Sequence, residues 1–465
     1  MNLSLQDPFS VAKEFPENLT STLTYGHSVC IQFNEQGDYL ASGLSDGSIV
    51  IYDMASHGII AHITQDCHVR PITSISWSNC GRYILSSSQD WYCKLWDLSK
   101  IVSNDNCNND TNDTNDNTDK PLSLPLSSHL SPVIRQVKFD GPIWLASMHP
   151  KNHFVFVASL FEDSPVHVDL TNESKPIVTK LRTEPLANDV KEEERGEEEE
   201  RSRKRRKTND KHLTLVTTFS PEGRYFFAGT SKGWLNTFRA SDLNLVYSVK
   251  MANSNIKNIA ISPNGRKLAL NFSDRVIRQV DLPDILNADD DVKDWDFEID
   301  HKYQDVVNRL QWNSISFNHN ADFLIASTHG QSSHDLYLWE TSMGSLIKIL
   351  EGSNEELIEV KWNYRRCKIG SIGLDSGAIY IWLIQFPQKW SALAPDFVEV
   401  EENIDYVEKE DEFDILDENE LNKMRMEEVD LDVDITTKEA TDARGFETVE
   451  QNFIIPIDYH KKLFE

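Results

Sequence analysis

The sequence predicts an all-β protein: a seven-bladed β-propeller followed by an extended acidic C-terminal tail. Three observations support this prediction. Short runs alternate apolar with polar residues, which indicates β-strands. The residues that close successive repeats lie 42 to 44 positions apart in three of six intervals, and a period near 40 is typical of propeller blades. Acidic residues become much more frequent after Trp382.

The stretch from Cys67 to Asp97 shows the repeat in its clearest form. Alternation predicts three strands, Ile72 to Trp77, Tyr83 to Ser88 and Tyr92 to Trp96, joined by turns rich in Gly, Asn and Asp. A histidine near the start and a closing Trp-Asp pair make this block resemble one WD40 repeat.

That resemblance implies that His68, Ser88, Asp90 and Trp96 form a hydrogen-bonded set within one blade. A half-buried Asp in a turn needs donors, and imidazole, hydroxyl and indole N–H groups supply them. A His near an Asp also occurs in acid–base and metal sites. We interpret this pair as structural.

The same pattern recurs along the chain. The repeats close at Tyr52, Trp96, Val168, Phe238, Val280, Trp339 and Trp382. The Ser-Pro-x-Gly-Arg element, at 220–224 and 262–266, is the expected hairpin between the first two strands of a blade. The third repeat, from Ile143 to Asp169, is degenerate. Seven repeats predict seven blades, and the segment from Leu19 to Tyr25 is expected to complete the last blade and close the ring.

Polar and charged insertions interrupt the propeller, which we expect to span residues 1–390. The insertions at about 103–130 and 183–211 are predicted to be disordered. A third acidic segment, Asp289 to Asp300, is expected between the fifth and sixth blades. The second insertion contains a run that fits a nuclear import signal, a contact to a phosphate backbone, or a solvated loop that pairs with the acidic run before it. This basic run includes Arg203, Lys204, Arg205, Arg206 and Lys207.

Composition argues against several classes of protein. The net charge of −29 gives no bulk attraction to nucleic acid. The six Cys contain no C-x-x-C pair, the N-terminus lacks a signal-peptide pattern, and no apolar run reaches the roughly 18 residues of a membrane span. G-x-S-x-G, H-E-x-x-H and Walker-type motifs are absent. We therefore expect an intracellular protein that is not an enzyme, with no metal, cofactor, small-molecule substrate or membrane partner.

The predicted tail, residues 391–465, is acidic but not purely polar. Between Asp396 and Asp434 it carries eighteen acidic and three basic residues, with apolar residues spaced among them. Acidic segments with regularly spaced apolar residues are typical of chains that order on a partner.

The tail also carries a specific resemblance. Trp390 to Phe397, followed by Glu401 to Tyr406 and Glu412 to Asp414, is similar to one family of WD40 proteins. This is the retinoblastoma-binding-protein-5-type subunit of the COMPASS (trithorax/MLL-like) histone H3 lysine-4 methyltransferase complexes. The resemblance covers nearly the whole chain apart from the insertions, and the Asn-rich tract indicates a fungal member.

The resemblance implies a non-catalytic scaffold and activator whose tail binds three other subunits. Phe397 and Glu399 would contact the SET-domain methyltransferase subunit and favour its active arrangement, which raises activity by population shift. The SPRY-domain subunit would bind Glu410, Glu412, Phe413, Asp414 and Ile415. A second seven-bladed WD40 subunit would bind Val429, Leu431 and Val433, which alternate on one face of an extended strand. The run Ile454 to Ile457 is also similar to a family segment, without an assigned role.

The resemblance further implies a nuclear protein that contacts the nucleosome, both histone and DNA, through one edge of the propeller. Lys232, Arg275 and Arg309 lie on or near predicted loops there. Two alternatives stay open: a WD40 substrate adaptor of a ubiquitin ligase, and a generic chromatin scaffold. Neither Trp96-Asp97-Leu98-Ser99 nor Trp339-Glu340-Thr341-Ser342 has the Trp-Asp-x-Arg pattern common in such adaptors. RNA binding through the basic run would need aromatic residues nearby, which the sequence lacks.

Overall fold

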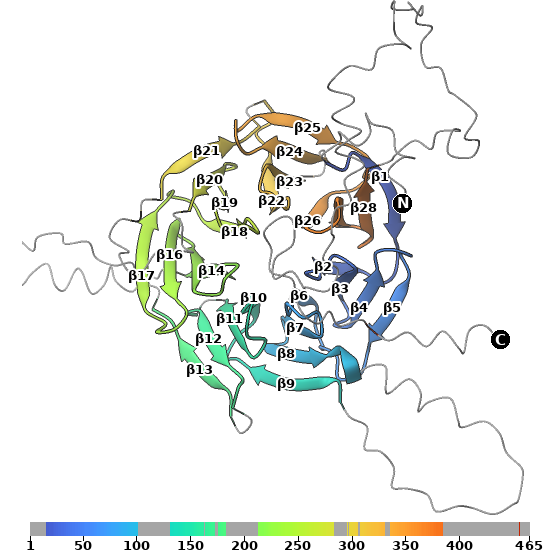
Figure 1. The fold of residues 1–465 in the computed structure, drawn as a ribbon, viewed down its shortest axis with the longest axis vertical. Helices are drawn as coiled ribbons and strands as arrows, with labels where there is room; N and C mark the ends of the chain where they lie inside the picture. Colours follow the sequence, from blue (N-terminus) through green and yellow to red (C-terminus); the bar gives the residue numbers. More distant parts are fainter. Residues whose placement is uncertain are drawn as a thin grey trace, which may run out of the picture. The chain divides into compact units, whose positions relative to one another are not determined.

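A computed structural model of the chain describes residues 15–100, 131–182, 213–282, 295–384 and Ile455, with short gaps at 162, 173–174, 296, 306 and 331–334. In this described part, 28 strands form seven four-stranded antiparallel sheets. The sheets are arranged around a central axis as the blades of a propeller (Figure 1). The predicted all-β, seven-bladed propeller is confirmed, and the predicted tail, residues 391–465, lies outside the described residues except for Ile455.

The strands of the first four blades follow the chain from the centre outwards. Blade 1 contains β2 (Ser28–Phe33), β3 (Tyr39–Leu44), β4 (Ile49–Asp53) and β5 (Ile59–Ile63). Blade 2 contains β6 (Ile72–Trp77), β7 (Tyr83–Ser88), β8 (Tyr92–Asp97) and β9 (Val133–Lys138). Blade 3 contains β10 (Ile143–Met148), β11 (Val155–Leu160), β12 (Val166–Asp169) and β13 (Ile177–Lys180). Blade 4 contains β14 (Thr214–Phe219), β15 (Tyr225–Thr230), β16 (Trp234–Arg239) and β17 (Leu245–Lys250). The three strands predicted in the clearest repeat are β6, β7 and β8.

Blades 5 and 6 have the same order. Blade 5 contains β18 (Ile256–Ile261), β19 (Lys267–Phe272), β20 (Ile277–Asp281) and β21 (Ile299–Tyr303). Blade 6 contains β22 (Gln311–Phe317), β23 (Phe323–His329), β24 (Leu336–Glu340) and β25 (Leu346–Leu350). A short 3₁₀ helix, Leu98–Lys100, follows β8. No helix in the described part is long and apolar enough to cross a membrane.

Blade 7 joins the two ends of the propeller. It contains β26 (Leu357–Asn363), β27 (Lys368–Gly373), β28 (Ile379–Leu383) and, as its outer strand, β1 (Asn18–Leu23). Asn18 pairs with Leu383 and Leu23 with Ile379, in antiparallel register. This confirms that the segment after Leu19 closes the ring, and it covers a sheet edge that would otherwise be exposed.

The structure corrects one predicted boundary. The segment Asp289 to Asp300 was expected between blades 5 and 6, but β21 pairs with β20, so the insertion lies within blade 5. The short β21 has three polar or charged residues between Ile299 and Tyr303, and only Tyr303 is buried. Together with the acidic residues before it, this conceals the strand in the sequence. The other two insertions, 103–130 and 183–211, lie outside the described residues.

Because every blade starts at its innermost strand, its loops fall on two opposite faces. We call the face with the second turn of each blade and the crossovers between blades the top face. The other two turns of each blade lie on the bottom face. Contacts agree with this division, since His68 N–H of a crossover donates to Gly47 O of a top turn over 3.0 Å. On the bottom face, Met54 N–H donates to Asp38 O over 2.8 Å.

The core lies between neighbouring blades. The second strands β3 and β15 are buried along their whole length, because each is covered by a blade on either side. Between blades 5 and 6 the aromatic rings of Tyr303 and Trp339 pack together, with centroids 5.5 Å apart. Each blade therefore depends on its neighbours for burial of its apolar side chains.

Candidate functional site

The hydrogen-bonded set predicted in blade 2 is centred on a serine that the sequence did not single out. His68 Nδ1 lies 2.9 Å from Asp90 Oδ2, and His68 Nε2 lies 2.8 Å from Ser86 Oγ. The indole N–H of Trp96 donates to the same Ser86 Oγ over 2.7 Å. Ser86, rather than Ser88, links the His to the Trp, so that part of the prediction was wrong.

Ser88 has a related but separate role. Its hydroxyl donates to Arg70 O over 3.0 Å and accepts the Asp90 N–H over 3.2 Å. Ser86 and Ser88 are two residues apart on one strand and face the same side. Sequence spacing cannot separate them, because the reach of the Trp96 ring decides which one it meets.

Asp90 holds the top turn of blade 2 against the preceding crossover. Its carboxylate accepts the N–H groups of Tyr92 and Val69 as well as the His68 ring. Burial would raise the pKa of Asp90, but the hydrogen bond and charge of His68 and the two N–H donors outweigh it, so the pKa lies below its usual value. With its carboxylate occupied in this way, the pair is a structural clasp rather than an acid–base site.

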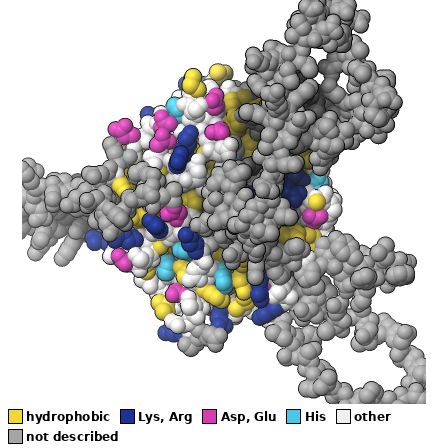
Figure 2. Space-filling view, viewed as in Figure 1, with side chains coloured by type: hydrophobic (Ala, Val, Ile, Leu, Met, Phe, Trp, Pro, Cys, Tyr) yellow, Lys and Arg dark blue, Asp and Glu magenta, His cyan; other side chains and the backbone are white. Residues whose placement is uncertain are grey.

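The three basic residues predicted near the nucleosome lie on the same face. Lys232 is in the top turn between β15 and β16, Arg275 is in the turn between β19 and β20, and Arg309 is in the crossover to β22. Lys232 comes from blade 4, Arg275 from blade 5, and Arg309 from the crossover between blades 5 and 6. Arg275 and Arg309 are exposed. We call these three residues the basic arc. Figure 2 shows that both signs of charge are present on the described part of the face that it views.

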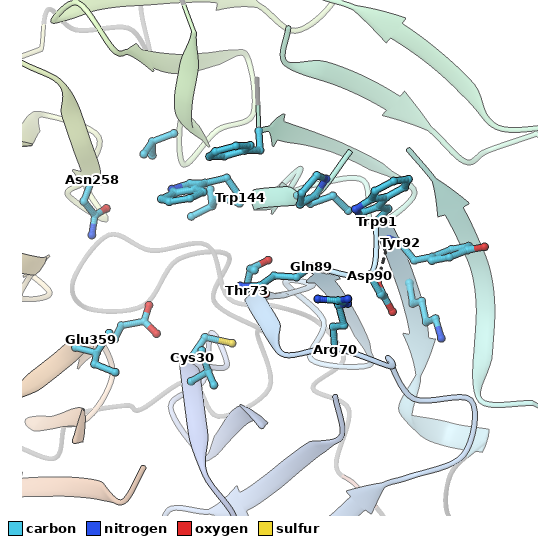
Figure 3. A pocket seen from close by; sticks show the side chains of 18 of the residues that line it. Cys30, Arg70, Thr73, Gln89, Asp90, Trp91, Tyr92, Trp144, Asn258 and Glu359 are labelled. Carbon is cyan, nitrogen blue, oxygen red and sulfur yellow. Dashed lines mark hydrogen bonds between the residues drawn. The ribbon is translucent and has the colours of Figure 1, made fainter. Parts of the chain in front are cut away.

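The top face also opens into a pocket of about 1070 Å³ at the centre of the ring. All seven innermost strands contribute to its lining. Figure 3 shows Trp91, Arg70 and Asp90 on one side of the opening, Trp144 on another, and Glu359 with Cys30 on a third.

The blade 2–3 side of this pocket is aromatic and exposed. Trp144 is 52% exposed and stacks on Phe161, with ring centroids 6.1 Å apart. Trp91 is 43% exposed and has a φ of +73°, at the turn position where blades 1 and 4 have Gly47 and Gly233. A bulky residue in this conformation is strained. Comparing the repeats at this turn is the sequence signal that could have found Trp91.

Cys30 and Glu359 lie near each other in the lining of the pocket (Figure 3). Burial, and next the Glu359 charge, raise the pKa of Cys30 well above its usual value, so its thiol stays protonated at neutral pH. Glu359 accepts the Ile31 N–H and pairs with Lys361 at 3.2 Å. No group of three or more His, Cys, Asp or Glu able to hold a metal occurs among the residues that the structure describes.

The remaining predicted site residues lie outside the described residues. These are the SET-directed Phe397 and Glu399, the SPRY-directed Glu410, Glu412, Phe413, Asp414 and Ile415, the WD40-directed Val429, Leu431 and Val433, and the basic run Arg203, Lys204, Arg205, Arg206 and Lys207.

Comparison with known proteins gives consistent results. Residues 18–53 and 61–97 match the family model "WD domain, G-beta repeat". "COMPASS component SWD1" of Saccharomyces cerevisiae is 41% identical over 99% of this chain and 98% of its own length. "Set1 complex component swd1" of Schizosaccharomyces pombe is 41% identical over 90% of this chain and 91% of its own length. "Retinoblastoma-binding protein 5 homolog" of Drosophila melanogaster is 29% identical over 94% of this chain and 77% of its own length.

A solved structure agrees with these relatives. The β-propeller domain of Cps50 (Swd1) from Myceliophteria thermophila superposes with a TM-score of 0.65 and is 35% identical in sequence. It covers 78% of this chain, and the match takes in 99% of that domain.

Proposed function

The chain belongs to the family of COMPASS component SWD1 and retinoblastoma-binding protein 5, and we propose that it is a non-catalytic WD40 subunit of a COMPASS-type histone H3 lysine-4 methyltransferase complex. The observation that carries this proposal is similarity to SWD1 along nearly the full chain, tail included. A complex that methylates histones works on chromatin, so the protein acts in the nucleus.

In this proposal the tail activates the methyltransferase. Phe397 supplies an apolar anchor and Glu399 a charge at the SET-domain subunit, and both bind its active arrangement in preference to the inactive one. A partner that binds one of two conformations more tightly shifts the population toward it by its difference in affinity. The tail then raises the rate without taking part in the chemistry.

The next two segments assemble the complex. Glu410, Glu412 and Asp414 meet a basic surface of the SPRY-domain subunit, with Phe413 and Ile415 as apolar anchors. Val429, Leu431 and Val433 lie along a groove of the second WD40 subunit as an extended strand.

The propeller contributes the nucleosome contact. The chain carries a net charge of −29, so attraction to DNA has to be local. The basic arc supports such a contact, because Lys232, Arg275 and Arg309 share the top face of adjacent blades. Side chains of this kind bind phosphates and set orientation on the DNA without reading its sequence.

A reconstituted methylation assay on histone H3 tests the proposal. It compares the full chain, a chain that ends after Pro395, and a Phe397→Ala, Glu399→Ala double variant, each with the SET-domain, SPRY-domain and second WD40 subunits. We expect the shortened chain to neither assemble nor stimulate. We expect the double variant to co-purify with all three subunits yet stimulate poorly.

One result would contradict this account. If the shortened chain stimulates as well as the full chain, the propeller alone is the functional part. A generic chromatin scaffold or a ubiquitin-ligase adaptor would then describe the protein better.

A further inference from the structure

Four blades begin their second strand with an aromatic residue at the bottom face: Tyr39, Tyr83, Tyr225 and Phe323. In three of them the next blade around the ring supplies a ring that covers it. His153 of blade 3 stacks on Tyr83 at 4.2 Å between centroids. Trp295 of blade 5 meets Tyr225 edge to face at 5.1 Å, and Phe15, just before β1 of blade 7, meets Phe323 at 5.5 Å.

In blade 1 the corresponding residue is met by the far end of the chain. Ile455 is 2% exposed and belongs to the same apolar cluster as Tyr39, Ile51 and Leu98. Its backbone N–H donates to Tyr39 Oη at 3.4 Å, across 416 positions of sequence. Tyr39 itself is only 9% exposed. Ile455 thus takes, at blade 1, the place that aromatic rings of the next blade take elsewhere.

The sequence around Ile455 differs from the rest of the tail. Residues 451–457, Gln-Asn-Phe-Ile-Ile-Pro-Ile, form the longest uncharged run after Asp396. Pro456 disfavours helix at the residue before it and favours an extended backbone at Ile455. An uncharged, isoleucine-rich sequence can be transferred from water to an apolar surface at lower cost than the acidic segments before it.

We propose that the propeller carries a docking site for the end of its own tail, with Ile455 as the anchor and Tyr39 as the receiving residue. We call this site the Tyr39 site. The proposed partner-binding residues, from Phe397 to Val433, then lie on a stretch of chain that is fixed to the propeller at both ends, at β28 and at Ile455. This inference goes beyond the proposed function, and it concerns the isolated chain.

Because Ile455 and the Tyr39 site belong to the same chain, one isoleucine can be sufficient to keep the site occupied. A segment that belongs to the same chain as its site is present there at an effective concentration of up to about millimolar. A site that binds a free peptide with only moderate affinity is therefore almost fully occupied by the chain's own segment. The same reasoning predicts that the site becomes available to a free peptide only when the chain's own anchor is removed.

The experiment uses a fluorescein-labelled peptide of residues 446–465 and three full-length chains: the natural sequence, Ile455→Asp, and Ile435→Asp as a matched control in the same tail. Peptide binding is followed by fluorescence anisotropy. We expect the Ile455→Asp chain to bind the peptide at least about 10-fold more tightly than the natural chain, and the Ile435→Asp chain to behave like the natural one. A peptide that itself carries Ile455→Asp should bind none of them.

Equal binding by the natural and Ile455→Asp chains overturns the proposal, as does absence of binding to both. Thermal unfolding of each variant shows that the propeller is intact. Adding Tyr39→Phe to the Ile455→Asp chain removes only the hydroxyl, and we expect several-fold weaker peptide binding from the lost hydrogen bond. Since no other subunit is present, this result is independent of the methylation assay.

Discussion

The indole N–H of Trp96 donates a 2.7 Å hydrogen bond to Ser86 Oγ, and that hydroxyl also meets the ring of His68. The Trp that closes the repeat is thereby joined to the His that opens it. Ser86, His68 and Trp96 are each no more than 1% exposed, so water cannot replace a lost partner.

Removing the Ser86 hydroxyl should lower the free energy of unfolding more than removing the Ser88 hydroxyl. Ser86→Ala leaves two buried groups, the Trp96 N–H and His68 Nε2, without this partner, and we expect a loss of about 2–4 kcal/mol of unfolding free energy. Ser88→Ala deletes the same atom two residues away, where the partners are backbone groups of a surface turn, and should cost about 1 kcal/mol. Urea unfolding of both variants measures the difference. Equal losses would show that Ser86 does not have the central place assigned to it.

Two glycines with positive φ should respond differently to a methyl group. Gly47 and Gly265 both have positive φ, at +91° and +69°. A Cβ on Gly47 would lie 2.0 Å from His68 O, whereas on Gly265 its nearest neighbour is 3.9 Å away. Gly265→Ala should therefore cost only the backbone strain, about 1 kcal/mol, and Gly47→Ala at least about 3 kcal/mol because the crossover must move. Thermal unfolding of the two variants tests this, and similar transition temperatures would contradict it.

Glu355 is expected to make the stability of blade 7 dependent on pH. Its carboxylate accepts the N–H groups of Asp375 and Ser376, both at 2.8 Å, and the Tyr380 hydroxyl at 2.6 Å. Burial would raise the pKa of Glu355, but these hydrogen bonds, with that of the Ser376 hydroxyl, hold it below its usual value.

A lowered folded-state pKa means that the ionised group stabilises the fold above the unfolded pKa of about 4.3. This stabilisation is lost as the pH falls through the folded-state pKa. We expect Glu355→Gln to cost about 1–3 kcal/mol at pH 7 and much less at pH 3. Urea unfolding across this pH range measures it. A cost that stays constant with pH would argue against a charged Glu355 at neutral pH.

Substitutions in the basic arc should weaken binding to nucleosomes without changing the methylation of a free histone peptide. Changing Lys232, Arg275 and Arg309 to Ala should weaken nucleosome binding by the assembled complex. If each contacts a phosphate, the slope of log affinity against log salt should fall by roughly 3. Methylation of an H3 peptide should not change.

A control triple on the bottom face separates this effect from net charge. Lys151, Arg224 and Arg266 are exposed and lie in the first turns of blades 3, 4 and 5. Their change to Ala removes the same charge. If both triples alter the salt dependence equally, a specific contact by the basic arc is excluded.

The local pattern of this sequence predicts its blades well, because each blade is a run of adjacent antiparallel strands with short turns. In the clearest repeat, two predicted strands have the same first and last residues as β6 and β7. The degenerate third repeat still corresponds to β10, β11 and β12. The fourth strands were harder to find, since a strand such as β21 consists mostly of polar and charged residues and follows an insertion.

The site was less predictable than the fold. His68, Asp90 and Trp96 could be grouped from their residue types, but Ser86 depends on how far a Trp ring reaches across two strands. The exposed aromatic side of the central pocket joins Trp91 and Trp144 from different blades. The contact of Ile455 with Tyr39 spans 416 positions, and no periodicity carries information over that distance.

The pairing of β1 with β28 has a consequence for how the protein is made. Asn18 leaves the ribosome 365 residues before Leu383, its partner. At synthesis rates of about 5–20 residues per second, that interval lasts roughly 20–70 seconds. During this interval β1 is unpaired and the propeller is incomplete. Both expose strand edges that can pair with other chains. The strand β1 is thus made before the rest of the propeller and paired after it, and we expect chaperones to bind it during synthesis.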